Sequence, residues 1–213
     1  MTCAWQCEID PFCNKILEKH WPDVRRYKDV KEVGKHNLEP VELICGGFPC
    51  QDISASGKQA GITQGSRSGL WFEYKRIICE IRPRWIIVEN VENILRQGIG
   101  IVLGDLAACG YDAQWDVLPA KEFGAPHTRE RIFIVANSNG ERCKNAPQRF
   151  DQVRLFERIP TTKTWLSELP ESAICGVDDG IPDRVDRLKS LGNAVVPQVV
   201  EFIGRCIMEV DGI

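Results

Sequence analysis

Two short, largely apolar runs separated by a helical pattern most strongly restrict the fold available to this chain. The runs are Val41–Cys45 and Trp85–Val88. Between them, apolar residues recur with helical spacing from Leu70 to Ile81, and Pro83 ends the pattern. Strand-like runs that alternate with helical segments indicate β-α-β units and a parallel sheet. The expected fold is therefore α/β, with a doubly wound sheet.

The rest of the chain extends this alternation on both sides. Asp10-Pro11 predicts a helix start, with Asp10 as the N-cap and proline at the first helical position. The further expected elements are strands at Ala4–Ile9, Ala113–Leu118 and Arg131–Ala136, a weaker helix near Ile101–Cys109 and a closing helix at Val199–Met208. After Asn137 the periodicity is lost until about Asp183. We therefore expect three parts: a catalytic α/β domain over 1–137, a small segment over 138–183, and a return to the first domain over 184–213.

Composition excludes several classes of protein. The chain has 213 residues, 43% of them apolar and 27% charged, so one substantial core is expected. No apolar run approaches the roughly 20 residues that span a bilayer, and the N-terminus lacks the layout of a signal peptide. Ten cysteines are scattered without paired spacing and the three histidines lie far apart, so no metal site is expected. We expect a soluble, cytoplasmic monomer.

Two of the expected strands end on residues that can carry chemistry. Cys50 follows the first run in Gly46-Gly47-Phe48-Pro49-Cys50-Gln51, and Glu89 follows the second in Glu89-Asn90-Val91. Ligands of open α/β sheets bind beyond the carboxyl ends of the strands. A thiol and a carboxylate are therefore expected at one site.

The polar segment after the last expected strand carries a local excess of positive charge, although the whole chain has a net charge of −3. Six cations lie between residues 142 and 163, against Asp151 and Glu157. A phosphate-facing surface is expected there. The cations are Arg142, Lys144, Arg149, Arg154, Arg158 and Lys163.

Four motifs, taken together and in this order, resemble the bacterial and phage DNA cytosine-5 methyltransferase family. They are Gly46–Gln51, Glu89–Val91, Thr128–Arg131 and Arg187–Pro197. The resemblance covers about Trp5–Ala136 and Arg184–Met208, and the polar middle matches the position of the family's target-recognition segment. It implies a Rossmann-like sheet of the class I S-adenosylmethionine-dependent methyltransferases, with a small target-recognition insert.

The resemblance also implies a mechanism, namely transfer of a methyl group from S-adenosylmethionine to carbon 5 of a cytosine flipped out of duplex DNA. Cys50 would add to carbon 6 as a thiolate. Glu89 would hydrogen-bond or protonate ring nitrogen 3. Arg129 and Arg131, at what looks like the start of a strand, would present both guanidinium groups on one face, one for the base carbonyl and one for Glu89 or a phosphate. His127 stands where the family usually has glutamine.

For the cofactor, the resemblance implies contacts from several separate segments. Glu8 would hold the ribose hydroxyls, with Ile9 beside the adenine and Asp29 at the adenine amino group. The remaining cofactor contacts would be Pro49, Leu70 and Asn193. Double-stranded DNA is the implied partner. Its expected contacts are Gln51, Ser54, Ser56, Arg142, Arg149, Arg154 and Arg158.

One family feature is not found in these 213 residues. The family opens with a strand and a glycine-rich turn of the pattern Phe-x-Gly-x-Gly, whereas this sequence reaches the second strand by Trp5. The first strand of the sheet is therefore expected to be absent. We expect weak cofactor binding by this chain alone, and a separate N-terminal fragment with that strand as a partner that restores it.

Three functions stay open at this stage. The first is an active DNA cytosine-5 methyltransferase, full or truncated. The second is a catalytically silent remnant that still binds DNA, and the third is a methyltransferase acting on RNA cytosine. Covalent trapping on 5-fluorocytosine DNA would separate the first two, and competition between DNA and structured RNA would address the third.

Overall fold

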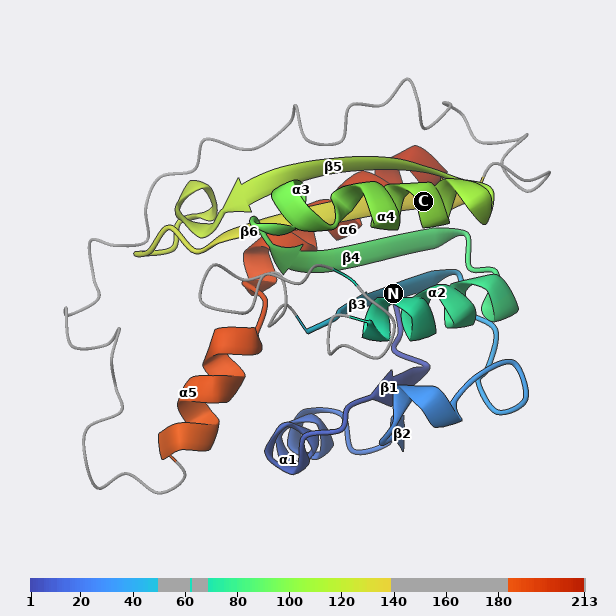
Figure 1. The fold of residues 1–213 in the computed structure, drawn as a ribbon. Coiled ribbons are helices and arrows are strands. Elements are labelled where there is room, and N and C mark those ends of the chain that lie inside the picture. The colour runs from blue at the N-terminus through green and yellow to red at the C-terminus, as the bar shows by residue number, and fades with distance from the viewer. Residues whose placement is uncertain (50–61, 63–68, 139–183, 213) are drawn as a thin grey trace.

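The computed structural model describes residues 1–49, 62, 69–138 and 184–212. These residues form two sheets (Figure 1). The larger has four strands in the order β3 (Leu43–Gly47), β4 (Trp85–Val91), β6 (Glu130–Ser138) and β5 (Tyr111–Pro119). The smaller pairs β1 (Trp5–Cys7) with β2 (Arg25–Tyr27).

Strand directions make the larger sheet mixed. β3 and β4 run parallel, whereas β6 is antiparallel to both β4 and β5. The smaller sheet is parallel. The helices are α1 (Pro11–His20), α2 (Leu70–Ile81), α3 (Ile94–Gln97), α4 (Ile99–Ala108), α5 (Arg184–Asn193) and α6 (Pro197–Asp211), with short 3-10 turns at Val30–Glu32 and Ala120–Phe123.

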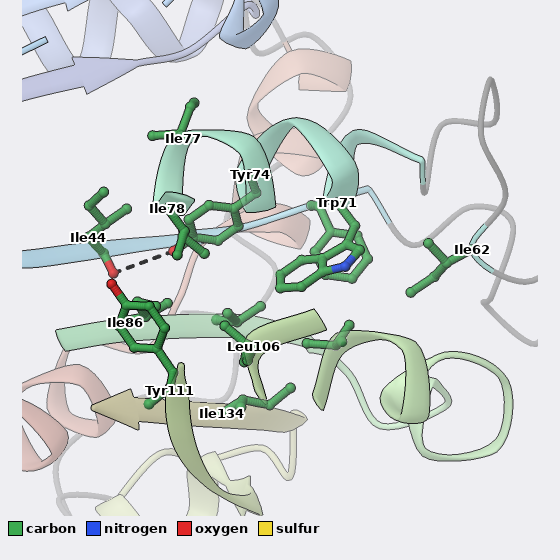
Figure 2. Close-up of a cluster of buried hydrophobic side chains, with 14 of the residues drawn as sticks. Ile44, Ile62, Trp71, Tyr74, Ile77, Ile78, Ile86, Leu106, Tyr111 and Ile134 are labelled. Atoms are coloured by element: carbon green, nitrogen blue, oxygen red, sulfur yellow. Dashed lines mark hydrogen bonds between the residues drawn. The ribbon is translucent and has the colours of Figure 1, made fainter. Parts of the chain in front are cut away.

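Both faces of the central strands are buried, which explains why their sequences are apolar without alternation. On β4, Ile86 and Val88 pack into the cluster that contains Trp71 and Leu106 of α2 and α4. Figure 2 shows this cluster, in which side chains of α2 face those of the sheet. The opposite side chains of β4 and β6, such as Ile87 and Val135, pack against α6. The sheet is therefore covered by α2 and α4 on one face and by α6 on the other.

The helix boundaries agree with the expected signals. The Asp10 side chain accepts hydrogen bonds from the Phe12 and Cys13 amides at 2.9 and 3.3 Å, and Pro11 is the first helical residue. α2 ends where Arg82 adopts a left-handed conformation with φ of 57°, directly before Pro83. Both helix predictions are confirmed.

Several elements, among them α3 and the two 3-10 turns, are not expected from the sequence, and β2 and α5 are the two that involve distant partners. β2 has the sequence Arg-Arg-Tyr and shows no apolar alternation, and it is a strand because it pairs with β1. α5 is largely polar, and its side-chain contacts run to α1. Both depend on partners distant in sequence, which local periodicity does not reveal.

β1 and β3 belong to separate sheets. Without the first strand of the family, these two strands are expected either to pair directly or to leave backbone groups unpaired, and they do not pair. The two sheets nevertheless share one core, because Trp5, Cys7 and Tyr27 pack against the same cluster as Ile44. The segment 138–183, except for Ser138, lies outside the described residues, so the structure gives no boundary for the expected target-recognition part.

Candidate active site at the ends of β3 and β4

The adjacent ends of β3 and β4 bring Gly47 against Glu89. The two residues are paired in register, and a Cβ atom added to Gly47 would lie 2.9 Å from Glu89 Oε2 and 3.1 Å from the Glu89 carbonyl oxygen. Such contacts are closer than a methyl group tolerates. Glycine at this position therefore leaves the room that the Glu89 carboxylate occupies.

Asn90 fixes the path of the chain where it leaves β3. Its side chain is 3% exposed, and Nδ2 donates to the Phe48 carbonyl oxygen at 3.1 Å. Phe48 is buried against Trp71, with ring centroids 5.6 Å apart. Pro49 is exposed and follows directly. The sequence shows Asn90 in the Glu-Asn-Val motif but gives it no role, and the available clue is a polar residue that follows Glu89 at the end of an apolar strand.

Glu89 forms an ion pair with Arg131 of the neighbouring strand, with Arg131 Nε 3.1 Å from Glu89 Oε1. Glu89 lies opposite Phe133 in the antiparallel β4–β6 ladder, so Arg131, two residues away, is on the same face. Burial raises the pKa of the Glu89 carboxyl above its ordinary value, while Arg131 and Arg129 oppose this shift. Burial therefore outweighs two nearby cations.

Arg129 has a different position from the one that strand alternation predicts. β6 begins at Glu130, and Arg129 precedes it with a positive φ of 30°. Its Nη2 donates to the Gly192 carbonyl oxygen at 2.8 Å and to that of Ala194. Burial, followed by the repulsion from Arg131, lowers the pKa of the Arg129 guanidinium. Arg129 thus joins the Glu89 cluster to the connection between α5 and α6.

The expected cofactor carboxylates follow β1 and β2, which are parallel neighbours. Glu8 comes directly after β1, and its Oε1 accepts a hydrogen bond from the Asp10 amide at 2.8 Å. Asp29 caps the Val30–Glu32 turn by accepting from the Lys31 amide at 2.9 Å. Burial, helped by Asp29 and Glu8, raises the pKa of Cys7 to about 11. Both carboxylates are therefore close enough to the Cys7 thiol to raise its pKa.

Three other expected cofactor contacts come from separate parts of the chain. Ile9 is 71% exposed and lies in the connection between β1 and α1. Asn193 is exposed at the end of α5, and α5 docks on α1 through Lys189 Nζ to Asp10 Oδ2 at 2.5 Å. Leu70 is half-buried at the start of α2.

Several expected site residues lie outside the described part of the chain. They are Cys50, Gln51, Ser54, Ser56, Arg142, Arg149, Arg154 and Arg158. Within the described ranges, no cluster of three or more histidine, cysteine, aspartate or glutamate side chains could hold a metal ion. The helices in those ranges include none with the length and apolar character needed to cross a membrane.

The fold is that of the class I S-adenosylmethionine-dependent methyltransferases. A crystal structure of a putative DNA modification methyltransferase from an E. coli prophage matches with a TM-score of 0.51 and 23% identity, covering 63% of this chain and 40% of that one. A DNMT2 structure from Spodoptera frugiperda matches with a TM-score of 0.53 and 18% identity, covering 68% and 44%. At these identities the similarity concerns the fold.

Residues 1–179 match the C-5 cytosine-specific DNA methylase family, and the chain belongs to this family. It is 34% identical to the Type II methyltransferase M.NgoBV of Neisseria gonorrhoeae over 146 residues, which cover 63% of this chain and 34% of that protein. It is 30% identical to M.HhaI of Haemophilus parahaemolyticus over 176 residues, covering 81% and 51%. The chain thus spans about a third to a half of the length of these relatives.

Proposed function

We propose that this chain carries the catalytic part of a DNA cytosine-5 methyltransferase. The observation that carries the proposal is the Glu89 carboxyl, which has a raised pKa, is paired with Arg131 and lies against Gly47 two residues before Pro49-Cys50. Membership of the cytosine methylase family supports the same reaction.

The chemistry assigns a separate role to each residue. Carbon 5 of cytosine is a poor nucleophile, so Cys50 adds through its thiolate to carbon 6 of the flipped base. Glu89 donates a hydrogen bond or proton to ring nitrogen 3, and its raised pKa favours the protonated form that this requires. After methylation, loss of the carbon 5 proton and departure of the thiolate restore the aromatic ring.

Arg131 and Arg129 support this reaction from two directions. Arg131 holds the Glu89 carboxylate in place through the 3.1 Å ion pair. Arg129 is anchored on the carbonyl groups of Gly192 and Ala194, so its charge stays near Glu89. One of the two guanidinium groups binds the base carbonyl oxygen when cytosine enters.

The residues after β1 and β2 suit S-adenosylmethionine. Carboxylates such as Glu8 and Asp29 accept hydrogen bonds, which matches ribose hydroxyls and an adenine amino group. The exposed Ile9 offers an apolar contact for a base. Pro49, Leu70 and Asn193 complete the proposed set. When bound, the cofactor supplies the methyl group.

DNA contacts come from two segments. Gln51, Ser54 and Ser56 lie directly after the proposed nucleophile, where they reach the flipped base and its phosphates. The cations of the 142–163 region bind the duplex backbone, and 138–183 is the target-recognition segment.

Covalent trapping tests this function. The chain is incubated with S-adenosylmethionine and duplex DNA containing 5-fluorocytosine, both alone and with a peptide that carries a strand and a Phe-x-Gly-x-Gly turn. With the peptide present, we expect a denaturation-resistant adduct that disappears in Cys50→Ser and forms roughly 10²–10⁴-fold more slowly in Glu89→Gln. Glu92→Gln, an exposed neighbour on the same segment, is the matched control. Salt-sensitive DNA binding without an adduct under both conditions would instead indicate a silent DNA-binding protein.

A further inference from the structure

Cys79 and Cys109 place two thiols together where the C-terminal ends of α2 and α4 meet. Their sulfur atoms are 2.6 Å apart, and a disulfide bond is about 2.05 Å long. Cys79 lies in the last turn of α2 and is exposed, whereas Cys109 caps the C-terminus of α4 and is half-buried. One thiol is therefore accessible to a reagent, and the other lies beside it.

The contact follows from the packing of α2 on α4. Lys75 binds Asp105 at 2.5 Å, and Trp71 Nε1 donates to the same carboxylate at 2.8 Å. Cys79 is four residues after Lys75, and Cys109 is four residues after Asp105. Since residues four apart lie on one helix face, the same register that joins 75 to 105 joins 79 to 109.

The surroundings hold this pair in place. Arg82 donates a hydrogen bond to the Cys109 carbonyl oxygen, and its guanidinium lies 5.3 Å from the centre of the Tyr111 ring. Tyr111 in turn donates to the Pro83 carbonyl oxygen at 2.7 Å. The chain on both sides of the pair is thereby fixed, so little movement separates the two thiols from a bonded geometry.

We propose that Cys79 and Cys109 form a dithiol site that low-molecular-weight disulfides oxidise to an intramolecular disulfide, which braces α2 on α4. A thiolate of the pair attacks the disulfide reagent, forming a mixed disulfide and releasing one thiol. The second protein thiolate then attacks the protein sulfur of that mixed disulfide and releases the second thiol. Two protein thiols are oxidised and one reagent disulfide is reduced.

The Cys79–Cys109 pair lies near the end of β4 that is opposite to Glu89. Cys79 is near the C-terminal end of α2, which leads into the beginning of β4, whereas Glu89 is near the end of that strand. The crosslink therefore stabilises the helix layer without touching the proposed reaction centre. The crosslink is therefore expected to change the melting temperature of the protein.

The test is equilibration of the chain with oxidised glutathione, followed by tryptic mapping without reduction. We expect residues 77–84 linked to residues 97–121, lighter by two hydrogen atoms than the sum of the two reduced peptides. The melting temperature should rise by about 5 °C, because the bond closes a long loop in the unfolded chain. Reduction should reverse both results.

Serine variants show which cysteines form the disulfide. Cys79→Ser and Cys109→Ser should each abolish the linked peptide and the thermal shift, whereas Cys13→Ser, a half-buried thiol of α1, should retain them. Cys79 is exposed, so its serine variant keeps the test valid if Cys109→Ser fails to fold. Persistent glutathione on Cys79, a link between two chains, or an unchanged melting temperature in the linked protein would overturn the proposal.

Discussion

The Glu89 carboxyl experiences opposing electrostatic effects. Burial disfavours its charged form, whereas Arg131 and, less strongly, Arg129 favour it. The raised pKa means that the carboxyl binds its proton more tightly in the folded chain than in the unfolded chain. Its contribution to stability is thus greatest at low pH and is lost as the pH rises through the folded-state pKa. Removing a cation should increase this shift.

Arg131→Gln should therefore raise the pKa of Glu89 further, because Arg131 lowers this pKa more than Arg129 does and that effect is lost. The measurement is a pH titration of the ¹³C resonance of the side-chain carboxyl, assigned with Glu89→Gln. Arg129→Gln serves as the matched control and should raise the pKa by less. An unchanged or lowered pKa in Arg131→Gln would show that the ion pair does not govern this carboxyl.

Gly47 offers a second residue-scale test, with Gly46 as its neighbour for comparison. In Gly47→Ala the new methyl group would press on the Glu89 carboxylate and carbonyl, at 2.9 and 3.1 Å. Displacing a reacting group by about 1 Å can cost roughly 10²-fold in rate, so trapping should slow by that order. Gly46→Ala, whose nearest atoms lie 3.9 Å away on Tyr74, should trap nearly normally. Equal rates in the two variants would argue against steric control of Glu89.

Among the elements, α5 is attached through polar contacts of those of its side chains that the structure describes. Val185 and Leu191 are 76% and 61% exposed, and the helix is attached through Lys189 to Asp10 and through Ser190 to Cys13. Arg129 holds the connection that follows it. By contrast, α6 buries Val199, Ile203, Cys206, Ile207 and Val210 against the sheet. Local opening should therefore be easier for α5.

Arg129→Gln should accelerate amide exchange in α5 by roughly 10- to 150-fold, since a hydrogen bond to a charged group contributes roughly 1.5–3 kcal/mol. Exchange in α6 should change little. The measurement is hydrogen exchange followed by mass spectrometry. Arg205→Gln, which removes an exposed pair with Glu201 inside α6, controls for loss of a cation. Uniform acceleration in both helices would mean that Arg129 supports the whole fold.

At the scale of the molecule, the two sheets share a core but not a hydrogen-bonded ladder. β3 pairs with β4 alone among the described strands, and its residues Cys45, Gly46 and Gly47 are exposed. Gln6 Oε1 of β1 is buried and has no hydrogen-bond partner among the described residues. In the smaller sheet, β1 pairs with β2. Strand edges of this kind accept an added strand through backbone hydrogen bonds.

We accordingly expect residues 1–213 alone to bind S-adenosylmethionine weakly or not at all. A peptide that carries a strand followed by a Phe-x-Gly-x-Gly turn should increase both the affinity and the melting temperature, since an added strand forms backbone hydrogen bonds with a free strand edge. Calorimetric titration of the cofactor with and without the peptide is the measurement.

A peptide of the same composition with proline in the strand provides the control, because proline cannot donate to a ladder. It should have no effect. Micromolar cofactor binding by the 213 residues without any peptide would show that Glu8, Asp29 and Asn193 suffice.

The local sequence was enough to predict much of the fold. Pro11 and Asp10 specify the start of α1, Pro83 follows the end of α2, and the apolar runs at 41–45 and 85–88 become β3 and β4. These features depend on neighbouring residues, through capping, proline geometry and periodicity. The four ordered motifs likewise sufficed for the family.

The contacts of the candidate site depend on chain segments that folding brings together. Glu89 meets Arg131, Asn90 meets Phe48, and Arg129 meets the carbonyl of Gly192, although each pair is distant in sequence. The positive φ of Arg129 replaces the strand alternation that its sequence suggests. β2, α5 and the Cys79–Cys109 pair arise in the same way. Local patterns define elements, but only their packing sets which side chains meet, how deeply a carboxylate is buried and hence how its pKa shifts.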